Sequence, residues 1–144
     1  MKNSGWAWDK CGVASAGIVL VASLLAGCGS GREVEVKGEV TAPATLAVQG
    51  MIIVDFLDVT GDGDSKAEVV RSVELDAPGS FAEKVSLEGD RVIVRAIDDA
   101  DGDGACTAGE AWAEAQADVA TDDTVEPVTL TLSNAPCPAS TGGG

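Results

Sequence analysis

Apolar and polar residues alternate along most of the chain between residues 33 and 133, and short turns separate the patterned stretches. In the first stretch Val34, Val36 and Val40 share one side and charged residues the other, which is the two-residue period of a half-buried β-strand. Seven stretches of strand length are alternating or continuously apolar, at residues 33–41, 51–57, 67–75, 80–87, 91–97, 111–119 and 125–133. Short strands at this regular spacing predict an all-β fold, a single antiparallel β-sandwich over residues 33–134.

Some of these segments carry further expectations. Residues 51–57 are largely apolar, so this strand should be central in its sheet. The Glu-Gly-Asp sequence at residues 88–90 predicts a tight hairpin. Residues 111–119 have a helix-like content of alanine and glutamate, yet alanine alternates with polar residues; we predict a strand and leave helix open. No internal repeat is evident, and the Pro/Ser/Gly-rich residues 135–144 predict a flexible tail that frays beyond Cys137.

The N-terminal segment is typical of bacterial export. Lys2 and Lys10 precede an uncharged run over residues 12–25, which is too short to span a hydrocarbon core of about 30 Å comfortably. A basic start, a short apolar stretch and small residues after it predict a secretory signal. The alternatives are an ordinary cleaved signal in which Cys28 is a coincidence, and an uncleaved anchor.

The four residues Leu25-Ala26-Gly27-Cys28 resemble the lipobox of bacterial lipoproteins. That resemblance implies a signal peptide at residues 1–27, a diacylglycerol-bearing Cys28 and a short lipidated tether at residues 28–32. It also implies attachment to a membrane through the N-terminal lipid. Gly29 follows the cysteine, where lipoproteins of the inner membrane of enteric bacteria often carry aspartate, so the resemblance favours the outer membrane or the cell surface, facing the periplasm or the exterior.

Composition and charge exclude several classes of function. The net charge of −15 argues against nucleic-acid binding, which needs a basic surface, and favours attraction of cations. The chain has no histidine, so the usual general base and the usual zinc ligand are both absent from the sequence. Of its four cysteines, Cys11 would leave with the signal and Cys28 would take the lipid. Outside the cytoplasm, the remaining Cys106 and Cys137 should form a disulfide.

The most informative motif begins at Asp99 and matches D-x-D-x-D-G-x₅-E over twelve positions. A calcium ion takes six to eight oxygen ligands at about 2.3–2.6 Å, and this spacing supplies them from one coiled loop. The predicted ligands are three aspartates, one carbonyl, one water-bridging residue and a closing glutamate, namely Asp99, Asp101, Asp103, Ala105, Thr107 and Glu110. Gly104 should supply the bend with positive φ. The alternative is a solvated Asp/Gly hairpin loop.

These twelve residues resemble the calcium loops of EF-hands and dockerins. They depart from that pattern at Cys106, where an aliphatic residue is usual, and in the strand-like flank before the loop. The wider pattern over residues 33–133 resembles the carboxypeptidase regulatory-like and prealbumin-like sandwiches of secreted bacterial proteins. This second resemblance implies a structural or binding module rather than an enzyme.

A weaker calcium candidate has oxygen donors at Asp58, Thr60 and Asp62 but no closing glutamate at its twelfth position. Two other functions also stay open. A carboxylate-dependent hydrolase, such as a glycosidase, would place an acid pair in a concave pocket away from the metal. A glycan-binding or adhesion module would use exposed aromatic residues, for which Trp112 is the candidate. The sequence identifies neither a protein nor a glycan partner.

Overall fold

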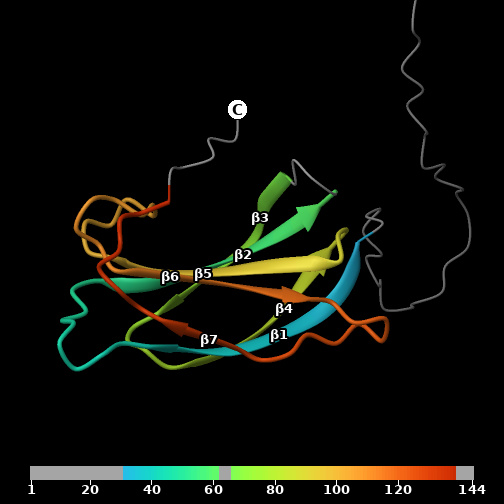
Figure 1. The fold of residues 1–144 in the computed structure, drawn as a ribbon, viewed down its shortest axis with the longest axis horizontal. Coiled ribbons are helices and arrows are strands. Elements are labelled where there is room, and N and C mark those ends of the chain that lie inside the picture. Colours follow the sequence, from blue (N-terminus) through green and yellow to red (C-terminus); the bar gives the residue numbers. More distant parts are fainter. Residues whose placement is uncertain (1–30, 62–65, 139–144) are drawn as a thin grey trace, which may run out of the picture.

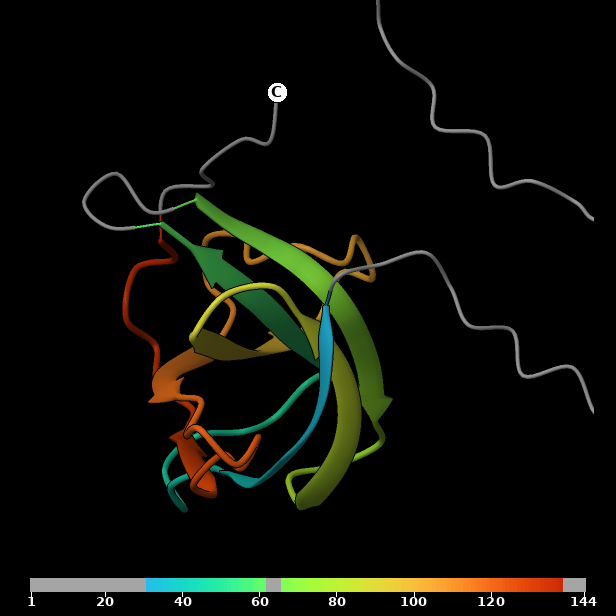
Figure 2. The same cartoon turned by 90° about the vertical axis from the view of Figure 1, so that its right-hand side faces the viewer.

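The computed structural model describes residues 31–61 and 66–138 and contains seven strands in two packed sheets. The strands are β1 (Arg32–Thr41), β2 (Met51–Thr60), β3 (Lys66–Leu75), β4 (Ser80–Leu87), β5 (Arg91–Asp99), β6 (Trp112–Asp118) and β7 (Val128–Thr131). One sheet has the order β4-β1-β7 and the other β3-β2-β5-β6; they form the lower and upper layers of Figure 1, which Figure 2 shows from the side. The predicted all-β sandwich is confirmed, β2 is central, and the segment over 111–119 is a strand.

The core lies between the two sheets and is built mainly from aliphatic side chains. Val36, Val54 and Val94 are fully buried, and they sit on the alternating apolar faces of β1, β2 and β5. The two phenylalanines meet edge to face, with the ring centroids of Phe56 and Phe81 5.7 Å apart. Burying each large apolar side chain contributes about 1.5–3 kcal/mol, so the two-residue period is the main reason that these segments fold as they do.

Two details of the topology differ from the sequence-based prediction. The pairing of β1 with β7 is parallel, so the sandwich is antiparallel in all its strand pairs but this one. The predicted hairpin at residues 88–90 is wrong, because β4 pairs with β1 in one sheet while β5 pairs with β2 in the other. The turn crosses between the sheets because the N–H groups of Glu88 and Gly89 donate to the Asp58 carboxylate of β2, at 2.8 and 3.0 Å.

The turn that precedes β2 is held in the same way. Asp98 of β5 is 3% exposed and accepts the N–H groups of Gln49 and Gly50, at 2.7–3.1 Å. Asp58 lies opposite Val92 and Asp98 lies opposite Ile52, so the two acids are related by a local two-fold between the antiparallel central strands. An acid near the end of each central strand therefore fastens the turn that leads into the other central strand.

The two ends of the sandwich are distinct. Arg32, at the start of β1, donates to the Gly89 carbonyl and to Asp90 at 3.2 and 2.7 Å, so β1 and β5 begin at the same end. β5 then runs to Asp99, a length of about 25 Å at the usual rise of a strand. The loop after Asp99 therefore lies at the far end from the entry of the chain, as Figure 1 shows.

The predicted signal peptide and Cys28 lie outside the described residues. Within the described part of the chain, no helix is long and apolar enough to cross a membrane.

Replacing Asp58 with alanine should lower the free energy of unfolding by about 1–3 kcal/mol, because it removes a buried carboxylate that accepts two part-buried main-chain N–H groups. Urea denaturation of the sandwich domain measures this change. Asp76→Ala is the matched control, since Asp76 is exposed and should change stability by less than about 0.5 kcal/mol. Equal effects of the two substitutions would contradict the proposed role of Asp58.

Candidate metal centre

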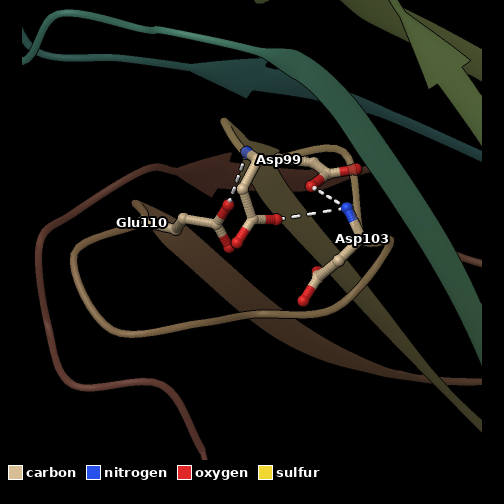
Figure 3. A group of neighbouring side chains, drawn as sticks. Asp99, Asp103 and Glu110 are labelled. Atoms are coloured by element: carbon tan, nitrogen blue, oxygen red, sulfur yellow. Dashed lines mark hydrogen bonds between the residues drawn. The ribbon is translucent and has the colours of Figure 1, made fainter.

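The predicted calcium loop connects β5 to β6, beginning at Asp99 and closing at Glu110. The structure brings four of the predicted side-chain ligands together, because one carboxylate oxygen from each of Asp99, Asp101, Asp103 and Glu110 lies within 4.8 Å of the others. An oxygen cluster of this size could hold a metal ion. Asp99 and Glu110 are buried and face each other inside the loop, as Figure 3 shows, whereas Asp101 and Asp103 are exposed.

Asp99 organises the first half of the loop. Its Oδ1 accepts the N–H groups of Gly102 and Asp103 at 2.9 and 3.1 Å, and its Oδ2 accepts that of Gly104 at 3.1 Å. Three successive main-chain donors therefore point toward one carboxylate, which coils the backbone tightly around it. Asp99 is 8% exposed, so these main-chain donors replace most of the water that would otherwise solvate its carboxylate.

Glu110 closes the loop from its other end. Its Oε1 accepts the N–H of Ala100 at 2.8 Å and that of Asp101 at 3.4 Å, while its Oε2 accepts the N–H of Thr107 at 2.9 Å. The two ends of the loop are also joined through the backbone, because the Asp98 N–H donates to the Ala111 carbonyl at 2.8 Å. The two buried acids thus fasten the start and the end of the loop to each other.

The exposed part of the loop has weaker support. The Thr107 hydroxyl donates to Asp101 Oδ2 at 3.3 Å, and the Ala105 N–H donates to Asp103 Oδ1 at 2.8 Å. These contacts place Thr107 beside a predicted ligand. The Ala105 carbonyl ligand and the water bridged by Thr107 stay predictions.

Three glycines of the loop have positive φ. Gly104 adopts φ of 74°, as predicted, and Gly102 and Gly109 adopt 76° and 100°. These values lie in the left-handed region, where a residue with a Cβ is strained. The roles of Gly102 and Gly109 were not predicted, although the Asp-Gly-Asp-Gly sequence carries a signal for the first of them.

No salt bridge among the described residues involves the four clustered acids. Arg71 and Arg95 instead pair with Glu83 and Glu114 on the strands. Among the described residues, the negative charge of the loop therefore meets main-chain N–H groups and the Thr107 hydroxyl but no basic side chain, and this is the electrostatic setting that favours a hard cation.

Cys106 and Cys137 form a disulfide with their Cα atoms 5.7 Å apart, as predicted. The start of the predicted flexible tail is also anchored, because the indole N–H of Trp112 donates to the carbonyls of Ala135 and Pro136, each at 3.1 Å. Residues 135–137 are thus fixed at the loop, as expected from the disulfide, while residues 139–144 lie outside the described part.

The weaker candidate at Asp58 receives no support from the described residues. Asp58 lies inside β2 and not in a loop, it is 6% exposed, and both of its oxygens accept main-chain N–H groups of the 88–89 turn. Thr60 ends the same strand, and Asp62 lies outside the described residues. Within those residues, Asp58 belongs to no acidic group that could hold a metal.

The features relevant to a hydrolase or a glycan-binding module lie close to the same loop. One surface depression of about 550 Å³ is lined in part by Asp55, Glu74 and Gly104. It therefore adjoins the Asp99–Glu110 loop, which we call the metal loop. Asp55 accepts a hydrogen bond from the Ser72 hydroxyl. The Trp112 ring is half-buried, and its N–H is occupied by the tail.

Comparison with known families, curated proteins and solved structures found no match. The resemblances to lipoproteins, to EF-hand and dockerin loops and to prealbumin-like sandwiches therefore rest on the sequence patterns that suggested them.

Gly104→Ala should lower stability by about 1 kcal/mol, because the added Cβ meets no atom within 4 Å and the cost is that of the left-handed backbone alone. In EDTA, the melting temperature should fall by about 4 °C. Gly79→Ala is the matched control, since its nearest neighbour would be 3.8 Å away and its φ lies outside the left-handed region. A melting temperature unchanged in Gly104→Ala would show that the loop does not need this backbone conformation.

Proposed function

We propose that this chain is a lipid-anchored, extracytoplasmic β-sandwich lipoprotein that binds Ca²⁺ in the Asp99–Glu110 loop and serves a structural or binding role. The observation that carries the proposal is the grouping of four carboxylates within 4.8 Å in the order expected for a calcium loop. The assignment to Ca²⁺ rests on ligand chemistry. All candidate ligands are oxygens, the sequence has no histidine, and both cysteines near the loop are joined in a disulfide.

The hydrogen bonds of the loop support a calcium site in a second way. Asp99 and Glu110 are held by main-chain N–H groups, so two ligands keep their positions without the ion. Asp101 and Asp103 are exposed and bring further negative charge, which a bound cation would convert from repulsion into coordination. The ligand set would be completed by the Ala105 carbonyl and a water held by Thr107.

The position of the loop suits a surface-facing role. If Cys28 carries the lipid, the chain enters the domain at Arg32 after a tether of at most about 18 Å. The Asp99–Glu110 loop is at the other end of the sandwich and would face away from the bilayer. A calcium ion there would stiffen the surface that a partner meets first.

Calcium should raise the melting temperature of the mature domain. At about 100 times the dissociation constant, linkage gives about 2.7 kcal/mol, which corresponds to roughly 10 °C for a domain of this size. Extracellular calcium modules have dissociation constants of about 10⁻⁴–10⁻³ M, so 10 mM CaCl₂ is about 10–100 times the dissociation constant, and the melting temperature should rise by roughly 5–10 °C relative to EDTA.

Asp101→Ala/Asp103→Ala should abolish that shift, because it removes two exposed ligands and leaves the buried hydrogen bonds of Asp99 and Glu110 intact. Its melting temperature in EDTA should equal or exceed that of the wild type, since repulsion is relieved. The control Asp76→Ala/Glu126→Ala removes the same charge from exposed positions elsewhere and should retain the shift. A calcium shift that survives in Asp101→Ala/Asp103→Ala would place the ion at another site.

Cys28→Ser should abolish lipidation, because the thiol that would carry the diacylglycerol is gone. Metabolic labelling with palmitate in a bacterial host, followed by membrane fractionation, measures the result. The label and the membrane association should both be lost, whereas Cys11→Ser should retain both. Label retained on Cys28→Ser would overturn the lipoprotein assignment.

A further inference from the structure

Residues 133–137, which we call the C-terminal strap, run from the end of the sandwich to the metal loop. Ser133 exchanges two backbone hydrogen bonds with Trp112, at 3.0 and 3.1 Å. The Trp112 indole then holds the carbonyls of Ala135 and Pro136, and Cys137 ends the strap in its disulfide to Cys106. The strap thus joins the first residue of β6 to the eighth position of the loop by five successive residues.

The strap meets the loop next to Thr107, which contacts both a buried acid and an exposed acid of the loop. Thr107 follows Cys106, and its N–H donates to Glu110 while its hydroxyl donates to Asp101. The Cys137 sulfur lies 3.1 Å from the Thr107 carbonyl; because a disulfide sulfur carries no hydrogen, this is a packing contact. The covalent bond and this contact both restrain the backbone of Thr107.

We propose that the C-terminal strap and its disulfide position the metal loop, so that the disulfide-bonded protein binds Ca²⁺ more tightly than the reduced protein. The inference rests on the proposed calcium function and adds a redox dependence to that site. A loop segment that is already ordered loses less conformational entropy when the ion binds. Because the coupling is reciprocal, bound Ca²⁺ should also make the disulfide harder to reduce.

The reduction is ordinary thiol–disulfide exchange with a dithiol. One thiolate attacks a sulfur of the Cys106–Cys137 bond, that bond breaks and the other cysteine leaves as a thiolate. The second thiol of the reagent then resolves the mixed disulfide. The dithiol loses two electrons and two protons and becomes a cyclic disulfide, and the two cysteines become thiols.

Calorimetric Ca²⁺ titration of the oxidised domain and of Cys106→Ser/Cys137→Ser tests the inference. The double variant should bind at least about fivefold more weakly, the lower end of typical couplings between sites. The control Ser80→Ala lies at an exposed position outside the metal loop and the strap, and it should stay within about twofold of the wild type. All proteins are checked for native circular dichroism at the titration temperature, so that a general loss of stability is not counted as weaker binding.

Equal affinities of the wild type and the folded double variant would overturn the role of the strap and leave the calcium function standing. No binding by the oxidised wild type would overturn the calcium function, and the strap inference with it. If the double variant does not fold, the fraction of reduced wild type is measured at equilibrium over a range of ratios of reduced to oxidised dithiothreitol. The ratio needed for half-reduction should be at least about fivefold higher in CaCl₂ than in EDTA, and equal ratios would overturn the inference.

Discussion

The ends of this sandwich depend on buried carboxylates that accept main-chain N–H groups. The described residues include four buried acids, Asp58, Asp98, Asp99 and Glu110. Each accepts at least two main-chain N–H groups, from turns or from the metal loop. A buried charge is costly unless such donors replace water, so each acid fixes the backbone that solvates it. The connections at the ends of β2 and β5 are therefore specified by charge and hydrogen bonding, while the strands are specified by apolar burial.

This division matters because the core is made of small side chains. Valine and alanine line most of it, and the two phenylalanines are its only aromatic residues. The alternation of small apolar residues fixes which face of each strand is buried, but it contributes little to the shape of the long connections. The acids supply that shape, and the disulfide adds a covalent link at the end where the longest loop lies.

The sequence predicted the strands and the clustered acids because both follow short-range rules. Alternation with a period of two residues places Val92, Val94 and Ala96 in the core, and the D-x-D-x-D-G-x₅-E spacing brings four acids to one loop. The function of Asp58 was not predictable in this way. Its partners are 30 and 31 residues away, so no local pattern reveals them. The parallel β1–β7 pair and the crossing turn at residues 88–90 depend on the same kind of long-range contact.

The four clustered acids of the loop differ in burial, because Asp99 and Glu110 are buried while the other two are exposed. Asp99 and Glu110 accept main-chain N–H groups, and they lie where β5 ends and just before β6 begins. Asp101 and Asp103 are exposed, and their hydrogen bonds lie within the loop. An ion bound among the four acids would therefore draw the two exposed ones, Asp101 and Asp103, toward the two buried ones, which main-chain N–H groups already hold in place. If the proposed calcium site is correct, the sandwich would keep its structure without the ion, and the ion would order only the exposed part of the loop.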